Sequence, residues 1–240
     1  MNHILRDLIN AGHVIVYMDD ILVFTDTIED HESIVWEVLR ILQENNLYLK
    51  PEKCNFETDH KDYLGIIVGN GTVRMDPKKV SVLNTWPTPL KKCDVQSFLG
   101  FCNFFRHFIQ GFSTVAYPLS QLTGNSEWSW GKKEQAAFEE LKRRIAEDVT
   151  LTIPLDDGKF QIEADSLDYA NGAVLSQFIG GKWRPIAFHS CLLNEVEQNY
   201  KIYDKEMMAI MDSLDEWRQY LLGAEHTVEI WTDHQNLQYF

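Results

Sequence analysis

The chain has 240 residues, 45% of them hydrophobic, so it is large and apolar enough to build the cores of one or two globular domains. Its formal net charge of −14 at pH 7 argues against a general nucleic-acid-binding surface, which needs clustered lysine and arginine to displace counterions. It contains no apolar run that could span a membrane and no secretory signal. We therefore expect a reducing intracellular compartment, where its four cysteines, which lack paired short spacing, stay as buried or idle thiols.

The chain begins with a predicted β-hairpin. Residues 14–17 and 21–24 are apolar runs, and the three residues between them, Met18-Asp19-Asp20, form a tight polar break. Residues 29–45 then carry apolar side chains at helical spacing with charged residues between them. This pattern predicts an amphipathic helix that covers the hairpin's sheet.

The middle of the chain is predicted to be a second hairpin followed by a helical module. Strands over 63–68 and 72–75 are joined by Gly69-Asn70-Gly71, whose residues tolerate positive φ. Asp76-Pro77 is a capping residue with a first-turn proline, and residues 77–147 then read as helical. One helix restarts near Asp94 with a broad aromatic face, and another covers 132–147 with Ala136, Ala137, Phe138, Leu141 and Ile145 inward.

The last third changes to a strand pattern. The order is three strands, a long helix and a last strand, predicted over residues 160–164, 172–178, 184–190, 195–222 and 227–232. Gly180-Gly181 marks the turn between the second and third strands. The module boundary is placed within 152–158.

Asp19 and Asp20 form the first candidate site. Two adjacent acids at the tip of an apolar hairpin repel each other unless a cation neutralises them, and carboxylate oxygens suit Mg²⁺. The structural alternative is an ordinary Asp-Asp turn.

Three further acids stand at element ends or inside the long helix: Asp165, Glu206 and Asp233. On a mixed sheet with the helix packed across it they could converge on one cluster, as phosphodiester hydrolysis with two metal ions requires. Separately they would be a turn residue, an exposed helix glutamate and a cap. His234 could help to release product or position a water, and Trp217 and Trp231 are read as core residues.

Together these residues resemble the Pol polyprotein of gypsy-type long-terminal-repeat retrotransposons along nearly the whole chain. Tyr17-Met18-Asp19-Asp20, followed by Ile21-Leu22-Val23, resembles the catalytic hairpin of reverse transcriptase. The resemblance implies that Asp19 and Asp20 bind Mg²⁺ and that Tyr17 and Met18 lie against primer end and template. Tyr63-Leu64-Gly65 is similar to the segment that grips the primer terminus, which makes Leu64 and Gly65 candidate substrate-binding residues.

The later part of the chain continues the resemblance. Phe98-Leu99-Gly100 and the run 104–109 resemble the thumb, and Trp130 with Ala137-Phe138 resembles the connecting segment. The last third resembles the family's RNase H, in Glu163-Ala164-Asp165-Ser166, Tyr203-Asp204-Lys205-Glu206 and Trp231-Thr232-Asp233-His234. The first three catalytic and metal-binding carboxylates then map onto Asp165, Glu206 and Asp233, and Glu163 adds an acid near the metals.

The expected fold class is α+β: a partial reverse transcriptase palm over 1–76, a helical thumb and connection over 77–151, and an incomplete RNase H-like mixed sheet with helices over 152–240, truncated at both ends. The resemblance implies RNA-directed DNA synthesis and cleavage of RNA in RNA–DNA hybrids with Mg²⁺ or Mn²⁺. The implied partners are an RNA template, a DNA primer, the hybrid and deoxynucleotides, with no membrane, in a cytoplasmic particle or the nucleus. Two alternatives are a nuclease without polymerase activity and an inactive relic that acts as a binding or structural module.

Overall fold

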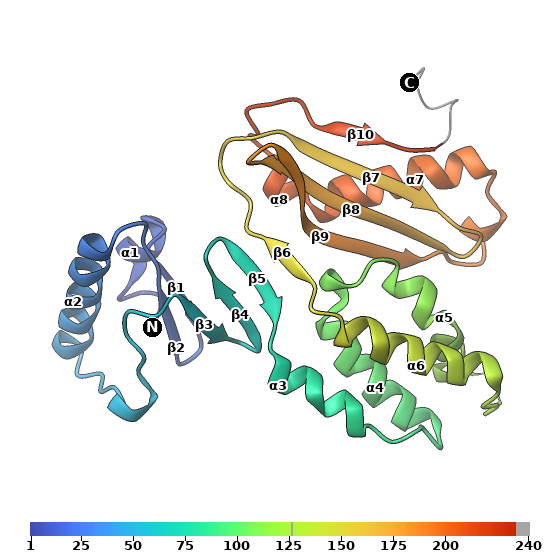
Figure 1. The fold of residues 1–240 in the computed structure, drawn as a ribbon, viewed down its shortest axis with the longest axis horizontal. Helices are drawn as coiled ribbons and strands as arrows, with labels where there is room; N and C mark the ends of the chain where they lie inside the picture. Colours follow the sequence, from blue (N-terminus) through green and yellow to red (C-terminus); the bar gives the residue numbers. More distant parts are fainter. Residues whose placement is uncertain (126, 234–240) are drawn as a thin grey trace. The chain divides into compact units, whose positions relative to one another are not determined.

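The computed structural model describes residues 1–125 and 127–233 and divides into two compact units, Met1–Tyr63 and Leu64–Phe240 (Figure 1). Helices and strands are mixed along the chain, which confirms the α+β class. Within the described ranges, no helix is both long and apolar enough to cross a membrane.

The first unit contains the predicted hairpin and its helix. Its elements are α1 (Arg6–Asn10), β1 (Val14–Tyr17), β2 (Asp20–Val23), α2 (Ile28–Glu44), the 3-10 turn η1 (Pro51–Lys53) and β3 (His60–Tyr63). The antiparallel register pairs Tyr17 with Asp20, so the turn consists of Met18 and Asp19 and the second strand starts one residue earlier than predicted.

Burial explains why α2 forms over the predicted range. Val38 and Leu42 are buried on one face of this helix and pack in a cluster with Leu5, Leu8 and Val14. The side chain of Thr27 caps the helix by accepting a hydrogen bond from the backbone N–H of Asp30 at 3.2 Å. The amphipathic pattern and the cap therefore agree on where the helix begins and which face it buries.

The first part of the second unit combines strands with the helical module. Its elements are β4 (Ile66–Gly69), β5 (Thr72–Met75), α3 (Pro77–Val80), the 3-10 turn η2 (Ser81–Thr85), α4 (Lys92–Phe104), the 3-10 turn η3 (Arg106–Phe108), α5 (Phe112–Thr123), α6 (Lys132–Ala146) and β6 (Thr150–Thr152). The predicted strand over 63–68 is wrong at its start, because Leu64 and Gly65 have φ values of +54° and +88° and interrupt the extended chain. The turn after Gly69 and the cap at Asp76 are confirmed.

The helical module has an aromatic core. Phe98 and Phe138 are fully buried and their rings lie 4.5 Å apart, which joins α4 to α6. Ala136 is exposed, so its predicted inward position is wrong, whereas its four predicted partners on α6 are buried. The sequence did not predict α5 as a separate helix, and Pro118 lies inside it.

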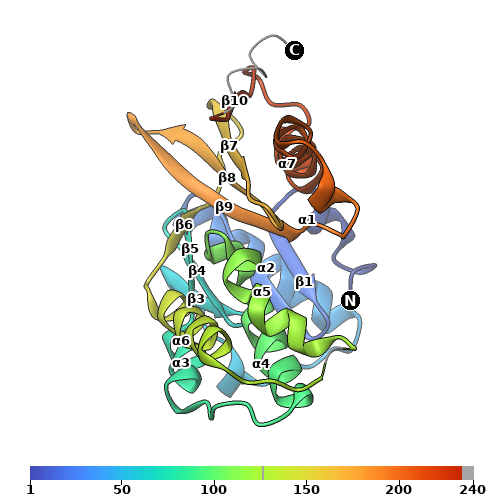
Figure 2. The same ribbon diagram turned by 90° about the vertical axis from the view of Figure 1, so that its right-hand side faces the viewer.

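The second part of the unit is a four-stranded mixed sheet with a helix across it. Its elements are β7 (Phe160–Ser166), β8 (Ala170–Ile179), β9 (Lys182–Leu192), the 3-10 turn η4 (Glu197–Asn199), α7 (Ile202–Glu216), α8 (Arg218–Leu221) and β10 (Glu229–Trp231). The strand order is β10-β7-β8-β9. The pairs β7–β8 and β8–β9 are antiparallel, and β10 is parallel to β7. Figure 2 shows α7 running along one face of this sheet. The predicted helix over 195–222 begins too early, because α7 starts at Ile202. The observed helix is also interrupted at Trp217, which separates α7 from α8.

Polar contacts fasten the helical module to the sheet. The backbone N–H of Ser113 donates to the hydroxyl of Ser190 at 2.9 Å, and the Ser113 hydroxyl donates to the Ser190 carbonyl at 3.0 Å. The Arg106 guanidinium donates to the same carbonyl at 2.6 Å, and the rings of Tyr117 and Tyr169 stack with centroids 4.4 Å apart. The hydrogen bonds hold the edge strand β9 against η3 and α5.

Candidate metal centre

The strand register brings two of the predicted acids together. In the parallel pair β7–β10, Trp231 lies opposite Glu163. Extending this register by two residues places Asp233 beside Asp165, so both carboxylates lie at the carboxyl end of neighbouring parallel strands. The third acid, Glu206, comes from α7, which packs against β7.

The three carboxylates converge as predicted. Asp165, Glu206 and Asp233 each offer a ligand oxygen, and these oxygens lie within 4.8 Å of one another. Glu206 is only 2% exposed, whereas the two aspartates are exposed. The cluster therefore has a buried floor and an open side.

Two hydrogen bonds hold Glu206 in place. The backbone N–H of Ser166 donates to one carboxylate oxygen at 3.2 Å, and the hydroxyl of Thr232 donates to the other at 3.2 Å. Ser166 follows Asp165 directly and Thr232 precedes Asp233, so the chain segments that carry the aspartates also orient the glutamate. The sequence predicts no role for either residue, because a backbone donor has no signature in the residue type and an isolated threonine has many roles.

The surroundings of Glu206 disfavour its ionised form. Burial raises the pKa of Glu206, and the charges of Asp165 and Asp233 raise it further, against the two hydrogen bonds, which lower it. A cation between the three groups would reverse this balance, because it attracts all three charges. The donor set consists of hard carboxylate oxygens, two of them open to solvent, which fits a divalent cation that retains water ligands.

Other predictions around this cluster have mixed outcomes. Glu163 is not a member of the group, and its carboxylate accepts a hydrogen bond from the side chain of Gln161 at 2.8 Å. Trp217 is 2% exposed, as predicted for a core residue, but Trp231 is 57% exposed because it lies on the edge strand β10. His234 lies outside the described residues.

The hairpin of the first unit presents the other predicted site. Asp19 and Asp20 are both exposed, and so are Tyr17 and Met18, at 53% and 78%. Met18 adopts φ +51°, a left-handed conformation that a two-residue hairpin turn requires. Tyr63 lies near these residues. Its hydroxyl is buried and has no hydrogen-bond partner among the residues that the structure describes, and burial, Asp20 and Tyr17 raise its pKa. The tip is therefore open to a ligand, and its metal-binding role stays a prediction.

Leu64 and Gly65 belong to the second unit. Leu64 is 39% exposed, and Gly65 lies against the Lys79 side chain, whose Nζ would be 2.6 Å from an added Cβ. The left-handed φ of Gly65 favours glycine, whereas the flexible Lys79 side chain could move away from an added Cβ. Their role in substrate binding also stays a prediction.

Basic side chains of the helical module make local contacts. Arg143 and Arg144 both donate to the Glu140 carboxylate at 2.7 Å, and these bonds lower the pKa of Glu140 to about 2. Lys92 donates to the backbone carbonyl of Gly124 at 2.8 Å.

Comparisons with known proteins agree with this arrangement. Residues 1–68 match the family model described as reverse transcriptase (RNA-dependent DNA polymerase), and residues 130–230 match the model of an RNase H-like domain found in reverse transcriptase. The chain is 38% identical over 236 residues to the Retrovirus-related Pol polyprotein from transposon opus of Drosophila melanogaster, covering 93% of this chain and 23% of that protein. It is 35% identical over 241 residues to the one from transposon 297 of the same species, covering 100% and 22%, and 32% identical over 228 residues to the Transposon Tf2-3 polyprotein of Schizosaccharomyces pombe, covering 94% and 17%.

Solved structures show the same fold. A foamy viral protease-reverse transcriptase in complex with double-stranded DNA aligns with a TM-score of 0.84 at 21% identity, over 99% of this chain and 42% of that chain. A complex of the foamy viral protein with an RNA/DNA hybrid aligns with a TM-score of 0.81 at 21% identity, over 98% and 32%.

The fold and the acidic cluster thus define a reverse transcriptase segment joined to an RNase H-like domain. The chain belongs to the Pol polyproteins of gypsy-type long-terminal-repeat retrotransposons. It spans about a fifth of the length of the curated relatives it matches. Reverse transcriptase and RNase H families use divalent metals, and the chain provides an acidic cluster suited to one.

Proposed function

We propose that the second unit cleaves the RNA strand of RNA–DNA hybrids, as one part of a longer polyprotein that synthesises DNA on an RNA template. The main observation in support of nuclease activity is that carboxylate oxygens of Asp165, Glu206 and Asp233 lie within 4.8 Å of one another. Mg²⁺ or Mn²⁺ is the proposed cofactor, because both favour carboxylate oxygen ligands. Bound there, the metal would supply charge stabilisation for the attacking and leaving oxygens of a phosphodiester.

The three acids would have different roles in such a site. Asp165 and Asp233 face solvent, so they would hold the metals on the side from which a nucleic-acid backbone approaches. Glu206 would bind a metal from the buried side of the cluster, with its carboxylate oriented by the hydrogen bonds from Ser166 and Thr232. The buried position of Glu206 excludes water from one side of the site and strengthens each electrostatic contact there.

The hairpin supports a polymerase role within the longer protein. Asp19 and Asp20 would bind the metal of nucleotide transfer, and the exposed Tyr17 and Met18 would contact primer end and template. The proposed partners are the RNA template, the DNA primer, the hybrid and deoxynucleotides. The foamy viral complexes with double-stranded DNA and with an RNA/DNA hybrid support this proposal, since their proteins share the fold.

The test is cleavage of an end-labelled RNA–DNA hybrid by the purified chain with Mg²⁺ or Mn²⁺. The matched controls are Asp165→Asn, which removes one charge from the cluster, and Asp168→Asn, which changes an exposed aspartate outside it. Cleavage that is lost in Asp165→Asn and kept in Asp168→Asn would support the nuclease. Absence of cleavage by folded protein would instead favour the alternative of an inactive relic.

A further inference from the structure

A buried asparagine connects two of the elements that carry the acidic cluster. Asn171, on β8, is 2% exposed, and both polar atoms of its side chain have partners. At the end of β7, the hydroxyl of Ser166 donates to the Asn171 Oδ1 at 2.7 Å. On α7, a carboxylate oxygen of Asp212 accepts a hydrogen bond from the Asn171 Nδ2 at 3.0 Å. Asn171 therefore joins the strand that carries Asp165 to the helix that carries Glu206.

The pairing of β7 with β8 explains why this side-chain bridge matters at Ser166. The N–H of Leu167 donates to the carbonyl of Ala170 at 2.8 Å, and facing residues of an antiparallel pair alternate between hydrogen-bonded and non-hydrogen-bonded positions. Ser166 and Asn171 face each other one position along, so they form a non-hydrogen-bonded pair whose side chains lie close together. The Ser166 N–H therefore points away from β8, where Glu206 accepts it at 3.2 Å. The side-chain bond to Asn171 holds Ser166 to β8 from the other side.

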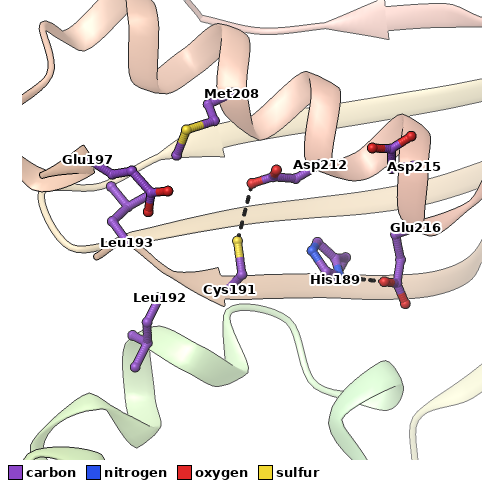
Figure 3. Close-up of a pocket in the computed structure, with 9 residues that line it drawn as sticks. All are labelled: His189, Cys191, Leu192, Leu193, Glu197, Met208, Asp212, Asp215 and Glu216. Carbon is purple, nitrogen blue, oxygen red and sulfur yellow. Dashed lines mark hydrogen bonds and ion pairs between the residues drawn. The ribbon is translucent and has the colours of Figure 1, made fainter. Parts of the chain in front are cut away.

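Asp212 is a well-held end for the bridge. It lines an open cavity of about 480 Å³ between β9, η4 and α7, beside His189 (Figure 3). Figure 3 shows the Cys191 thiol, on β9, donating to Asp212, and this bond of 3.3 Å reaches the same oxygen that Asn171 contacts. Burial and Asp212 raise the pKa of the thiol to about 12, so it keeps its proton at neutral pH and remains a donor. Donors from two neighbouring strands thus hold one carboxylate of α7.

We propose that Asn171 is a positioning residue, which sets how the Glu206 carboxylate lies relative to Asp165 by bridging the two elements that carry them. Glu206 and Asp212 are six residues apart on α7, a rise of about 9 Å, so a bond at Asp212 fixes the helix within two turns of the glutamate. This role rests on the proposed function of the cluster, because the bridge would orient its metal ligands. Groups that orient metal ligands change metal affinity by about 10–100-fold when they are replaced.

A swap of the two bridge residues tests this role. Asn171→Asp places a second carboxylate 3.0 Å from Asp212, so the two repel and the bridge breaks. Asp212→Asn keeps an oxygen that accepts from the Asn171 amide, so its effect should be small. The double variant Asn171→Asp with Asp212→Asn restores the bridge with donor and acceptor reversed. Its new carboxylate still accepts from the Ser166 hydroxyl.

Hydrogen exchange of the metal-free full chain, followed by NMR, is the first measurement. Asn171→Asp should reduce the protection of the Ser166 amide by at least about tenfold while the amide of the fully buried Leu175, also on β8, keeps its protection. A general loss of stability would instead lower both. The double variant should return the Ser166 amide to within about threefold of the wild type.

Mn²⁺ affinity, measured by electron paramagnetic resonance of the free ion, is the second measurement. Asn171→Asp should weaken Mn²⁺ binding by at least about tenfold, and the double variant should recover it. Asn84→Asp is the matched control, because it makes the same change at an exposed asparagine on η2, and it should equal the wild type in both measurements. If Asn171→Asp does not fold by circular dichroism, Asn171→Ala removes the bridge without adding a charge and should show the same two losses.

Wild-type protection of the Ser166 amide in the folded Asn171 variant would overturn the proposal. So would a folded double variant that is as impaired as Asn171→Asp alone. The exchange measurement needs neither metal nor hybrid. A wild type that binds no Mn²⁺ or cleaves no hybrid would therefore count against the proposed nuclease, and the result at Ser166 would still decide whether Asn171 positions the cluster.

Discussion

Replacing Glu206 by glutamine should stabilise the metal-free protein. The substitution keeps the shape of the side chain and removes a charge that is 2% exposed and flanked by Asp165 and Asp233. At the 4.8 Å limit, each of the two carboxylate pairs repels by about 0.9 kcal/mol at a water-like dielectric constant, the value suited to exposed aspartates. Removing both pairs contributes about 1.7 kcal/mol.

The hydrogen bonds act in the opposite direction. Glutamine still offers an oxygen to the Ser166 N–H, but both bonds to the former carboxylate lose their charge assistance, at a cost of about 1 kcal/mol in total. The repulsion is the larger effect, and the desolvation of Glu206 adds to it. We therefore expect Glu206→Gln to raise the Tm by roughly 2–4 °C in EDTA.

Mg²⁺ should reverse the stability advantage of Glu206→Gln, and low pH should remove it. A Mg²⁺ concentration ten times Kd stabilises the wild type by about 1.4 kcal/mol, whereas the variant has lost a metal ligand and gains less. The folded-state pKa of Glu206 is raised above its ordinary value of 4.5, so the wild type loses stability as pH rises through the folded value. The difference in EDTA should accordingly vanish below about pH 4.5 and grow above it.

The assay is thermal unfolding followed by circular dichroism, in EDTA and in Mg²⁺, from pH 4 to 8. Glu195→Gln is the matched control, because Glu195 is exposed and not part of the cluster, and its Tm should equal that of the wild type. A Glu206→Gln variant with a lower Tm in EDTA at pH 7, or with the same Mg²⁺ response as the wild type, would refute this reasoning.

Three other substitutions test the parts that position the sites. Phe98→Ala should destabilise the helical module by about 3–5 kcal/mol in urea unfolding, because Phe98 is fully buried against Phe138; an unchanged midpoint would contradict this core. Thr27→Ala should cost about 1 kcal/mol through loss of the α2 cap, measured as a lower urea midpoint of the first unit, while Thr27→Ser should retain most of it. Gly65→Ala should lower the Tm, because the residue has φ +88°, a left-handed conformation that alanine adopts only with strain; a neutral result would show that the turn can relax.

The sequence predicted best those elements in which an apolar run and the residues that end it indicate the same boundaries. The hairpin strands, α2 and the strands of the last third follow from continuous apolar runs ended by glycine or acidic residues. The prediction from sequence was wrong where a local polar contact determines the backbone conformation. The predicted helix over 195–222 starts only at Ile202, because the Asn194 side chain accepts hydrogen bonds from the N–H groups of Val196 and Glu197 and closes a separate turn.

The acidic cluster was predictable because strand ends and one helix carry it, and register alone places Asp165 beside Asp233. The cavity at His189 was not predictable in the same way. Its lining residues come from β9, η4 and α7, and each has an ordinary structural explanation by itself. Only the packing of α7 against the sheet shows that they face one another.

A chain of hydrogen bonds connects the acidic cluster with the cavity at His189. Ser166 holds Glu206 through its backbone N–H, and its hydroxyl donates to the Asn171 side-chain oxygen at 2.7 Å. The Asn171 amide donates to Asp212 at 3.0 Å, and Cys191 donates to the same Asp212 oxygen. Asn171 therefore links Asp212, which lines the cavity, to Ser166, whose backbone N–H orients Glu206. The acidic cluster and the cavity thus share one hydrogen-bond network, so a substitution at Asp212 should be checked for its effect on the acidic cluster.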